Sequence, residues 1–403
     1  MYDFNARIDR SGVHSLKWDN PHNTPGQENI LPLWVADMDF EALPEIQQAL
    51  LDRLRKPIFG YMRFPPAYFD SILDWHKTRY HRSLTREMLI PIPSVLHGLS
   101  MALRAFSNPG DAVLVQPPVY TPFFRVVTLN QRVVVEAPLK EPENPGQAWR
   151  FDPEQTRARL RASHEAGAPV KLWLFCSPQN PTGRVWTKKE LESVAQIAQE
   201  FDLLVLSDEI HADLVNPLVN FTSALDLPSL AERSLVVTGP NKTFNMAGLA
   251  IAHAFTRNPE LALKFRRAVE ADFYNEPHVL SIEAAWAAYR HGHQWLNELL
   301  EHLKGNFDVL RERLAAWNPP LTVCPWEGTY LAWVDARPLL AQRAYRDVAH
   351  LTESWEVSGR VKITAGSIYC TGGEGWLRFN LACPRPLLEQ ALDRIERWEK
   401  LTT

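Results

Sequence analysis

The chain has 403 residues, of which 45% are hydrophobic and 22% are charged, and its formal net charge is −4. This length and composition predict a globular protein with room for one large and one smaller domain, each with its own apolar core. The net negative charge provides no excess of basic residues for binding nucleic acid. The sequence also lacks the apolar run of about 20 residues that a membrane span requires. The four cysteines show no metal-ligand spacing and the first residues show no secretory signal, so we expect a cytoplasmic protein without a metal site.

The N-terminal part of the chain, through residue 40, is rich in turn-forming residues and predicts an irregular arm. We expect this arm to end in a short apolar strand at 33–36. Helical periodicity follows at 44–54 and again at 68–79, and a loop at 58–61 separates the two helices.

From residue 89 onward, short apolar segments alternate with amphipathic helical ones. We expect one helix at 98–106 and another after Thr187, which fits a capping box with Glu190. The apolar segments predict strands at 112–115, 133–137, 170–176, 203–206, 234–238 and 249–255. Such alternation is typical of a mostly parallel sheet that is covered by helices on both faces.

Beyond residue 260 the pattern is mainly helical, with a long helix from about 295 to 316. Strands are then expected at 330–334, 361–364 and 376–381, with helices around them, which predicts a separate α+β unit. We therefore expect three parts: an N-terminal segment that contributes to the small domain (1–45), a large domain (46–287) and a small C-terminal domain (288–403).

Several polar groups are predicted at the carboxyl ends of strands, where open α/β sheets bind their ligands: the loop at 94–96, Asn180, Asp208 and Lys242. Taken singly, Asp208 is more typical of a helix cap or a salt bridge, Asn180 of a turn, and Lys242 of an exposed loop. Together they match one cofactor. Pyridoxal phosphate needs a lysine for a Schiff base, a carboxylate for its pyridine nitrogen, an amide for its phenolate oxygen and a helix N-terminus for its phosphate.

Three motifs, at 177–183, 207–211 and 241–245, stand in the order and spacing of fold-type I pyridoxal-phosphate enzymes, the class I/II aminotransferase group. The chain also resembles the C–S β-lyase branch of that group, the cystathionine β-lyases of the MalY/PatB type. This finer resemblance rests on the residues at 33–40, 58–61, 117–120, 328–333 and 375–385, and it extends over nearly the whole chain. It implies the aspartate aminotransferase-like fold, with a mostly parallel sheet between helices in the large domain and a smaller α+β C-terminal domain.

The resemblance assigns roles at the cofactor residue by residue. Lys242 would form the Schiff base and remove the substrate proton, Asp208 would pair with the pyridine nitrogen, and Asn180 and His211 would lie near the ring oxygen. Tyr120 would stack on the ring. A structural histidine explains His211 equally well, and a core aromatic residue is the ordinary interpretation of Tyr120.

Other roles concern the phosphate, the substrate and the partner subunit. Backbone N–H groups of Val95 and Leu96 and the hydroxyl of Thr238 would bind the phosphate. Tyr61 would reach the phosphate of the neighbouring subunit's cofactor and take part in catalysis with Tyr120 and Lys242, which implies a homodimer. Arg378 would hold the substrate's α-carboxylate by a two-pronged hydrogen bond, with Val35 and Ala36 beside it.

The sequence departs from the family pattern around the lysine and late in the chain. Asn241 replaces a common serine, Gly239 replaces a serine or threonine, and 246–254 lacks the arginine that many relatives have there. The phosphate would then be bound mainly by the helix N-terminus, Tyr61 and hydroxyl groups. Thr-Ala-Gly-Ser at 364–367 replaces Asn-Pro-Gly-Ser in a loop that would border the substrate.

The implied activity is pyridoxal 5'-phosphate-dependent β-elimination, in which L-cystathionine or a related S-substituted L-cysteine yields pyruvate, ammonia and a thiol. The alternative is an aminotransferase, because both reactions share their first steps. A third hypothesis is a binding protein without catalysis, which is less favoured because Lys242 and Asp208 are both present. We expect a small amino acid as substrate and neither nucleic acid nor membrane as partner.

Overall fold

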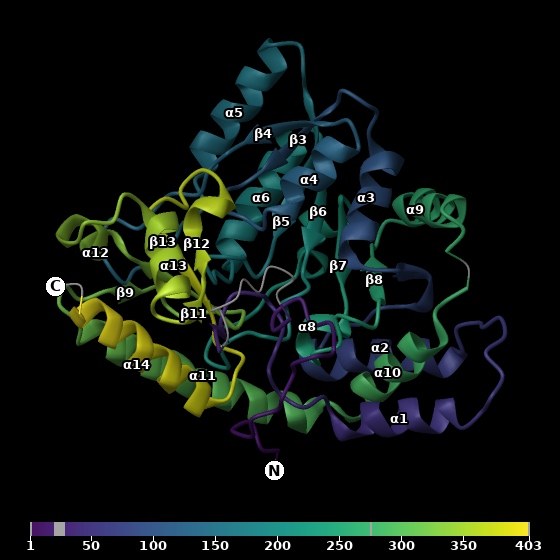
Figure 1. The fold of residues 1–403 in the computed structure, drawn as a ribbon. Coiled ribbons are helices and arrows are strands. Elements are labelled where there is room, and N and C mark those ends of the chain that lie inside the picture. Colours follow the sequence, from purple (N-terminus) through teal and green to yellow (C-terminus); the bar gives the residue numbers. More distant parts are fainter. Residues whose placement is uncertain (1, 20–28, 275, 402–403) are drawn as a thin grey trace.

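A computed structural model describes residues 2–19, 29–274 and 276–401, so part of the predicted N-terminal arm, 20–28, lies outside the described residues. At its centre is a seven-stranded sheet of order β2-β8-β7-β6-β5-β3-β4 (Figure 1). Its strands are β2 (Leu89–Ile92), β3 (Ala112–Val115), β4 (Val133–Glu136), β5 (Val170–Cys176), β6 (Leu204–Asp208), β7 (Ser234–Thr238) and β8 (Ala252–Phe255). Strand β8 is antiparallel to β2 and β7, and all other pairs are parallel, which confirms the predicted mostly parallel sheet.

Apolar side chains from this sheet enter two different cores, one on each face. In β5, Trp173 and Phe175 belong to one buried cluster, whereas Leu172 and Leu174 belong to another, because successive strand residues point to opposite faces. Helices α1, α2, α6 and α10 contribute to the first cluster, and α3, α4 and α9 contribute to the second. The helices of this part are α1 (Pro44–Leu54), α2 (Pro66–Tyr80), α3 (Val95–Phe106), α4 (Pro122–Leu129), α5 (Pro153–Glu165), α6 (Lys188–Glu200), α7 (Pro228–Ala231), α8 (Pro240–Thr243), α9 (Pro259–Ala271) and α10 (Val279–His291).

A smaller unit follows, built on a four-stranded antiparallel sheet of order β12-β13-β10-β9. Its core is a third cluster, which also includes Leu31 and Leu33 from the N-terminal part of the chain. Strand β1 (Leu31–Pro32) pairs in parallel with β11 (Val361–Lys362). The other elements are α11 (His293–Ala315), β9 (Thr322–Val323), β10 (Leu331–Asp335), α12 (Arg337–Gln342), α13 (Val348–Val357), β12 (Thr364–Ala365), β13 (Trp376–Asn380) and α14 (Arg385–Leu401).

Three sequence predictions of local structure are wrong. The strand expected at 33–36 is instead an irregular segment after β1, where side chains bind the backbone carbonyls that a strand would use for pairing. The strand expected at 361–364 is split between β11 and β12, which pair with different partners. Lys242 lies in the one-turn helix α8 and not in a loop, and β8 begins only at Ala252 because a turn precedes it.

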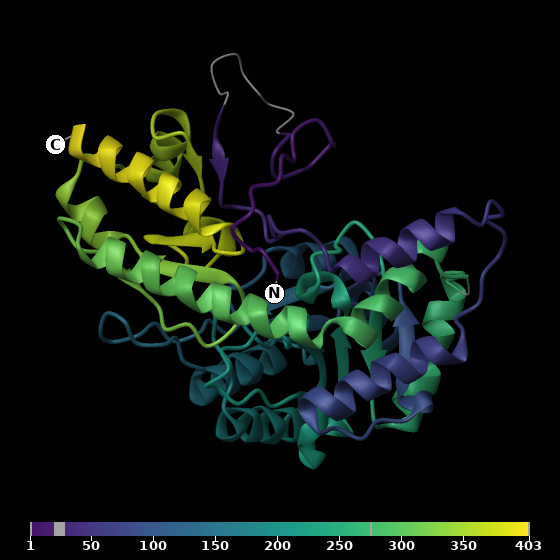
Figure 2. The ribbon, with the colours of Figure 1, turned by 90° about the horizontal axis from the view of Figure 1, so that it is seen from below.

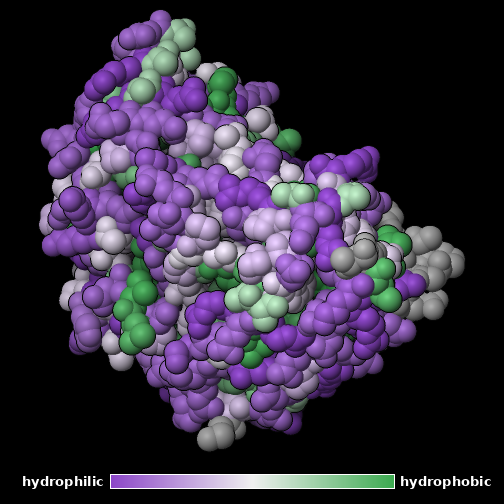
Figure 3. Space-filling view, turned by 90° about the vertical axis from the view of Figure 1, so that its left-hand side faces the viewer, coloured by the Kyte–Doolittle hydropathy of each residue, from purple (hydrophilic) through white to green (hydrophobic). Residues whose placement is uncertain are grey.

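The N-terminal segment runs between the two units, as the view from below shows in purple (Figure 2). The side of the molecule that carries the C-terminal helices has a mainly hydrophilic surface (Figure 3). Among the described residues, we find no helix whose length and apolar character would allow it to cross a membrane.

Candidate active site

A cavity of about 440 Å³ lies at the carboxyl ends of β5, β6 and β7. Cys176, at the end of β5, and Asp208, at the end of β6, contribute to its wall, together with the start of α3 and with residues of the small unit. Most of the predicted site residues line it: Val35, Ala36, Val95, Leu96, Tyr120, Asn180, Asp208, His211, Lys242 and Arg378. The structure therefore brings together groups that lie up to 343 residues apart in sequence, from Val35 to Arg378.

Lys242 reaches into this cavity from α8, and its Nζ donates a hydrogen bond to the Ala36 carbonyl at 2.6 Å. Burial, together with the nearby Arg378 charge, lowers the pKa of this amine to about 8, against the opposing effects of Asp37 and Asp208. A minority of Lys242 is therefore uncharged near neutral pH, far more than of an ordinary lysine, and the uncharged form is the one that a nucleophile or a general base requires.

The two departures next to the lysine have structural explanations. The Asn241 amide donates to the carbonyls of Met246 and Leu249 at 3.2 and 3.1 Å, which holds the turn after α8. A Cβ atom at Gly239 would lie 3.1 Å from the Cα of Ala252 in β8, so a hydroxyl side chain there would require the neighbouring strand to shift.

Asp208 is buried at the end of β6, with 4% of its surface exposed. One carboxylate oxygen accepts a hydrogen bond from the Ile210 N–H at 3.1 Å. Burial raises the pKa of this carboxyl to about 7, although the Lys242 charge opposes the shift. A cation placed beside this carboxyl would stabilise its charged form strongly, because few other groups compensate for the lost water.

Arg378 projects from β13 and is buried against Tyr369, whose ring centroid lies 5.0 Å from its guanidinium carbon. Its terminal nitrogens donate to the side-chain oxygen of Asn180 at 3.1 Å and to the Trp34 carbonyl at 2.7 Å. Its Nε has no hydrogen-bond partner among the described residues. Because an unpartnered buried donor is unfavourable, this arginine is suited to bind an anion that enters the cavity.

His211 also has an unpartnered buried atom, its Nδ1, among the residues that the structure describes. Its ring contacts Tyr330 edge-on at a centroid distance of 5.6 Å. Burial and the charges of Lys242 and Arg378 hold its pKa well below the usual value, so the ring is neutral at pH 7. A neutral ring that lines the cavity can exchange a hydrogen bond with a bound ligand.

The first residues of α3, Val95 and Leu96, form another part of the lining. The first N–H groups of a helix lack intrahelical partners, and the aligned peptide dipoles favour an anion there. Ser94 caps the helix by accepting from the His97 N–H at 3.3 Å. This end of the cavity is therefore suited to a phosphate group.

Two predicted residues lie outside the lining. The Thr238 hydroxyl donates to the Glu209 carbonyl at 3.0 Å, so it already has a partner within the protein. Tyr61 is 91% exposed and lies in the loop between α1 and α2.

Residues 28–395 match the family described as Aminotransferase class I and II. The chain belongs to this family. A Bacillus subtilis protein named cystathionine beta-lyase PatB is 33% identical over 98% of this chain and 99% of its own. The protein MalY of Escherichia coli is 32% identical over 97% of each chain. The crystal structure of cystalysin from Treponema denticola, which contains a pyridoxal 5'-phosphate cofactor, has a TM-score of 0.91 at 30% identity and covers 100% of both chains. These similarities confirm the predicted family, branch and fold.

The sequence interpretation missed several residues that line this aminotransferase-family cavity, among them Trp34, Cys176 and Tyr369. Trp34 lies within the family motif at 33–40. Tyr369 closely follows the departure at 364–367, in a loop that was expected to border the substrate. The position of both residues in the sequence was therefore a usable signal. For Cys176, the last residue of a buried strand, only strand length could have indicated that it borders the cavity.

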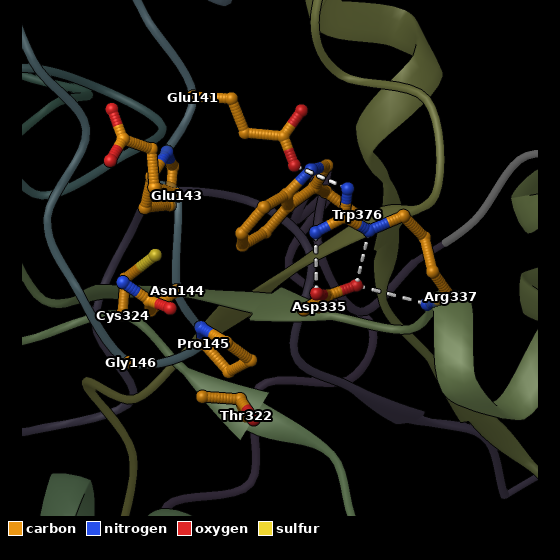
Figure 4. A pocket seen from close by; sticks show the side chains of 11 residues that line it. Glu141, Glu143, Asn144, Pro145, Gly146, Thr322, Cys324, Asp335, Arg337 and Trp376 are labelled. Carbon is orange, nitrogen blue, oxygen red and sulfur yellow. Dashed lines mark hydrogen bonds and ion pairs between the residues drawn. The ribbon is translucent and has the colours of Figure 1, made fainter.

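A second, smaller cavity of about 140 Å³ lies between the loop at 141–146 and the small sheet. Arg337 is already paired within this cavity, because it donates to Asp335 at 2.6 and 2.8 Å and also pairs with Glu141 (Figure 4). The larger cavity brings together Lys242, Asp208 and Arg378, so it is the better candidate for the active site of this aminotransferase-family protein.

Proposed function

We propose that the protein is a pyridoxal 5'-phosphate-dependent C–S β-lyase that converts L-cystathionine or related S-substituted L-cysteines to pyruvate, ammonia and a thiol. The observation that carries this proposal is the cavity in which Lys242, Asp208 and Arg378 meet. The proposal is supported by full-length similarity to proteins named cystathionine beta-lyase and cystalysin, the latter with the cofactor bound.

The lining residues fit pyridoxal phosphate. Lys242 and Asp208 would lie at the aldehyde and at the pyridine nitrogen, and the α3 N-terminus would bind the phosphate, with Asn180 and His211 near the ring oxygen. When bound, the cofactor supplies an aldehyde that condenses with amines and a pyridinium ring that accepts the electrons of a broken Cα–H bond. The Asp208 carboxyl, which burial leaves poorly compensated, would gain the cationic partner that it lacks.

The chain's own residues then account for substrate orientation and proton transfer. Arg378 would bind the α-carboxylate with its guanidinium, and its contacts with Asn180 and Trp34 fix the plane of that group. Lys242, with its lowered pKa, would take the proton from the substrate Cα at its Nζ and release its contact with Ala36 to do so.

The test that decides between elimination and transamination uses purified protein, L-cystathionine and no added keto acid. We expect pyruvate and free thiol in equal amounts, because elimination consumes no second substrate. Lactate dehydrogenase and a thiol reagent measure the two products, and protein without Lys242 is the control. Turnover that requires an added keto acid would instead assign the protein as an aminotransferase.

We also propose a homodimer in which Tyr61 reaches the cofactor of the other subunit. The proposal is supported by exposed apolar side chains in the loop that carries Tyr61, since Ile58 is 79% and Phe59 is 56% exposed. Leu51 and Leu54 of the adjacent α1 are also exposed. Clustered apolar residues on a protein surface commonly mark an interface between proteins.

Replacing Tyr61 with phenylalanine should weaken cofactor binding by about 10- to 100-fold without dissociating the dimer, since a hydrogen bond to a charged group contributes about 1.5–3 kcal/mol. Titration of cofactor-free protein measures the affinity, and sedimentation measures the assembly. Tyr2→Phe, at a half-buried tyrosine near α11, is the control. A monomeric protein, or an unchanged affinity, would contradict the proposal.

The division into an N-terminal segment (1–45), a large domain (46–287) and a small domain (288–403) likewise remains a proposal. It is supported by the separate apolar cluster of the small unit, to which Leu31 and Leu33 contribute from the first segment.

A further inference from the structure

Four charged side chains, two buried and two partly exposed, form a cluster where the N-terminal segment meets the irregular residues after β1. This charge cluster consists of Arg10, Lys17, Asp37 and Asp39. Lys17 Nζ lies 2.6 Å from one oxygen of Asp39, and Arg10 lies 2.6 Å from the other. Asp37 pairs with Arg10 at 2.9 Å and with Lys17 at 3.4 Å. All four residues lie outside the lining of the active-site cavity.

Stability alone does not explain such a cluster. The side chain of Lys17 is 0% exposed and that of Asp39 is 3% exposed, so both have lost their water. Replacing buried ion pairs with apolar residues of similar volume is often neutral or stabilising, because the desolvation cost offsets much of the attraction. The same ion pairs can instead select one arrangement of the backbone that carries them.

The two aspartates of the charge cluster belong to segment 34–39. Backbone carbonyls of this segment accept hydrogen bonds from two residues of the proposed active site. The Trp34 carbonyl accepts from Arg378 at 2.7 Å, and the Ala36 carbonyl accepts from Lys242 at 2.6 Å. The segment is neither helix nor strand, so no ladder of backbone hydrogen bonds fixes where these two carbonyls lie.

The charge cluster and the segment are joined by further hydrogen bonds. Lys17 Nζ donates to the Asp37 carbonyl at 3.1 Å, and Arg10 donates to the Met38 carbonyl at 3.0 Å. On the other side, Asn380 donates to the Val35 and Asp37 carbonyls at 2.5 and 2.6 Å. The segment is therefore held between the N-terminal residues and the strand that carries Arg378.

We propose that Arg10 and Lys17 are positioning residues: through Asp37 and Asp39 they hold segment 34–39 so that its carbonyls orient Arg378 for the substrate carboxylate and place Lys242. This inference rests on the proposed function of Arg378 and Lys242. Neither positioning residue touches the substrate; each acts through the backbone of the segment. Displacement of the Trp34 carbonyl would free the guanidinium to rotate away from the orientation that binds a carboxylate.

The test uses the holoenzyme and removes both charges of the Lys17–Asp39 ion pair, as Lys17→Met together with Asp39→Asn. This avoids an unpaired buried charge, and asparagine can still accept the hydrogen bond that the Trp18 indole gives to Asp39 at 2.8 Å. The probe is 3-(methylthio)propanoate, which carries the carboxylate and thioether of a substrate but no amine and so cannot react. We expect its affinity, measured by calorimetry, to fall by about tenfold, and KM to rise more than kcat falls.

Two further variants separate positioning from a structural role. Lys17→Arg alone keeps the positive charge beside Asp39, so this variant should retain most of the wild-type affinity for the probe. Arg82→Met with Asp226→Asn removes another ion pair, with contacts of 2.6 and 2.7 Å and a buried Arg82, in the large unit. This control should alter thermal stability and leave the affinity for the probe unchanged. The proposal is overturned if the Lys17/Asp39 variant loses stability but binds the probe as tightly as the wild type.

Arg378→Lys distinguishes this inference from the proposed function on which it rests. Weaker binding of the probe to Arg378→Lys, with unchanged binding to the Lys17/Asp39 variant, would overturn the positioning role alone. Unchanged binding to Arg378→Lys would show that the carboxylate binds elsewhere, and the proposed role of Arg378 would fall together with the inference.

Discussion

Lys242→Ala is expected to lower kcat/KM by about 10⁴-fold or more, because the substitution removes the residue that we propose as both the covalent anchor of the cofactor and the base that takes the substrate proton. Lys242 lines the cavity, and burial lowers the pKa of its amine. The fold should persist, since the side chain makes a single hydrogen bond, to Ala36.

Three measurements check this expectation. Steady-state release of pyruvate gives the rate, and borohydride reduction followed by digestion should label the peptide that contains Lys242 in the wild type only. Methylamine should restore part of the rate, because it can enter the 440 Å³ cavity and take the proton in place of the side chain. Lys304→Ala, at an exposed lysine of α11, should leave the rate unchanged. Near-normal activity of Lys242→Ala would refute the proposed mechanism.

The central sheet could be predicted because its strands are defined by local pattern. Strands β3, β5 and β7 have the predicted bounds, and all three are dominated by apolar residues of the kind that a parallel sheet buries on both faces. The capping box between Thr187 and Glu190 is also formed as expected, because both partners lie within one turn. Structural features that depend on residues close together in the sequence could therefore be predicted.

Segment 34–39 shows why other features of the structure could not be predicted from the sequence. Its apolar residues, Trp34 to Ala36, have the composition of a strand, yet their carbonyls accept hydrogen bonds from Lys242, Arg378 and Asn380. These partners lie more than 200 residues away, so no local pattern reveals them. The family resemblance marked the segment as important but could not show that Arg10 and Lys17 hold it.

Asp208→Asn is expected to lower kcat by about 10²–10³-fold while it stabilises the cofactor-free protein at neutral pH. The activity falls because a neutral amide cannot hold a proton on the pyridine nitrogen, so a preorganised charge is lost where electrons accumulate. KM should change less, since Arg378 and not Asp208 would bind the substrate carboxylate. Steady-state kinetics of the loaded variant measure both quantities, and a variant with normal kcat would remove Asp208 from the mechanism.

The gain in stability follows from the raised pKa. In the folded protein the Asp208 carboxyl keeps its proton up to about pH 7, whereas in the unfolded chain it releases it near the ordinary value of 3.8. Between these values the unfolded state binds fewer protons than the folded state, so the contribution of Asp208 to stability is present at low pH and is lost as the pH rises. Asparagine does not titrate and shows no such loss.

The free energy of unfolding of cofactor-free Asp208→Asn, relative to wild type, should therefore increase by about 2 kcal/mol between about pH 5 and pH 7. Denaturant unfolding at the two pH values measures it. Asp202→Asn, at a side chain that is 100% exposed, is the control and should show no comparable change. A pH-independent difference for Asp208→Asn would mean that burial does not perturb this carboxyl. Opposite effects on stability and on kcat would instead identify Asp208 as a charge that is unfavourable for the empty fold and is retained for the cofactor.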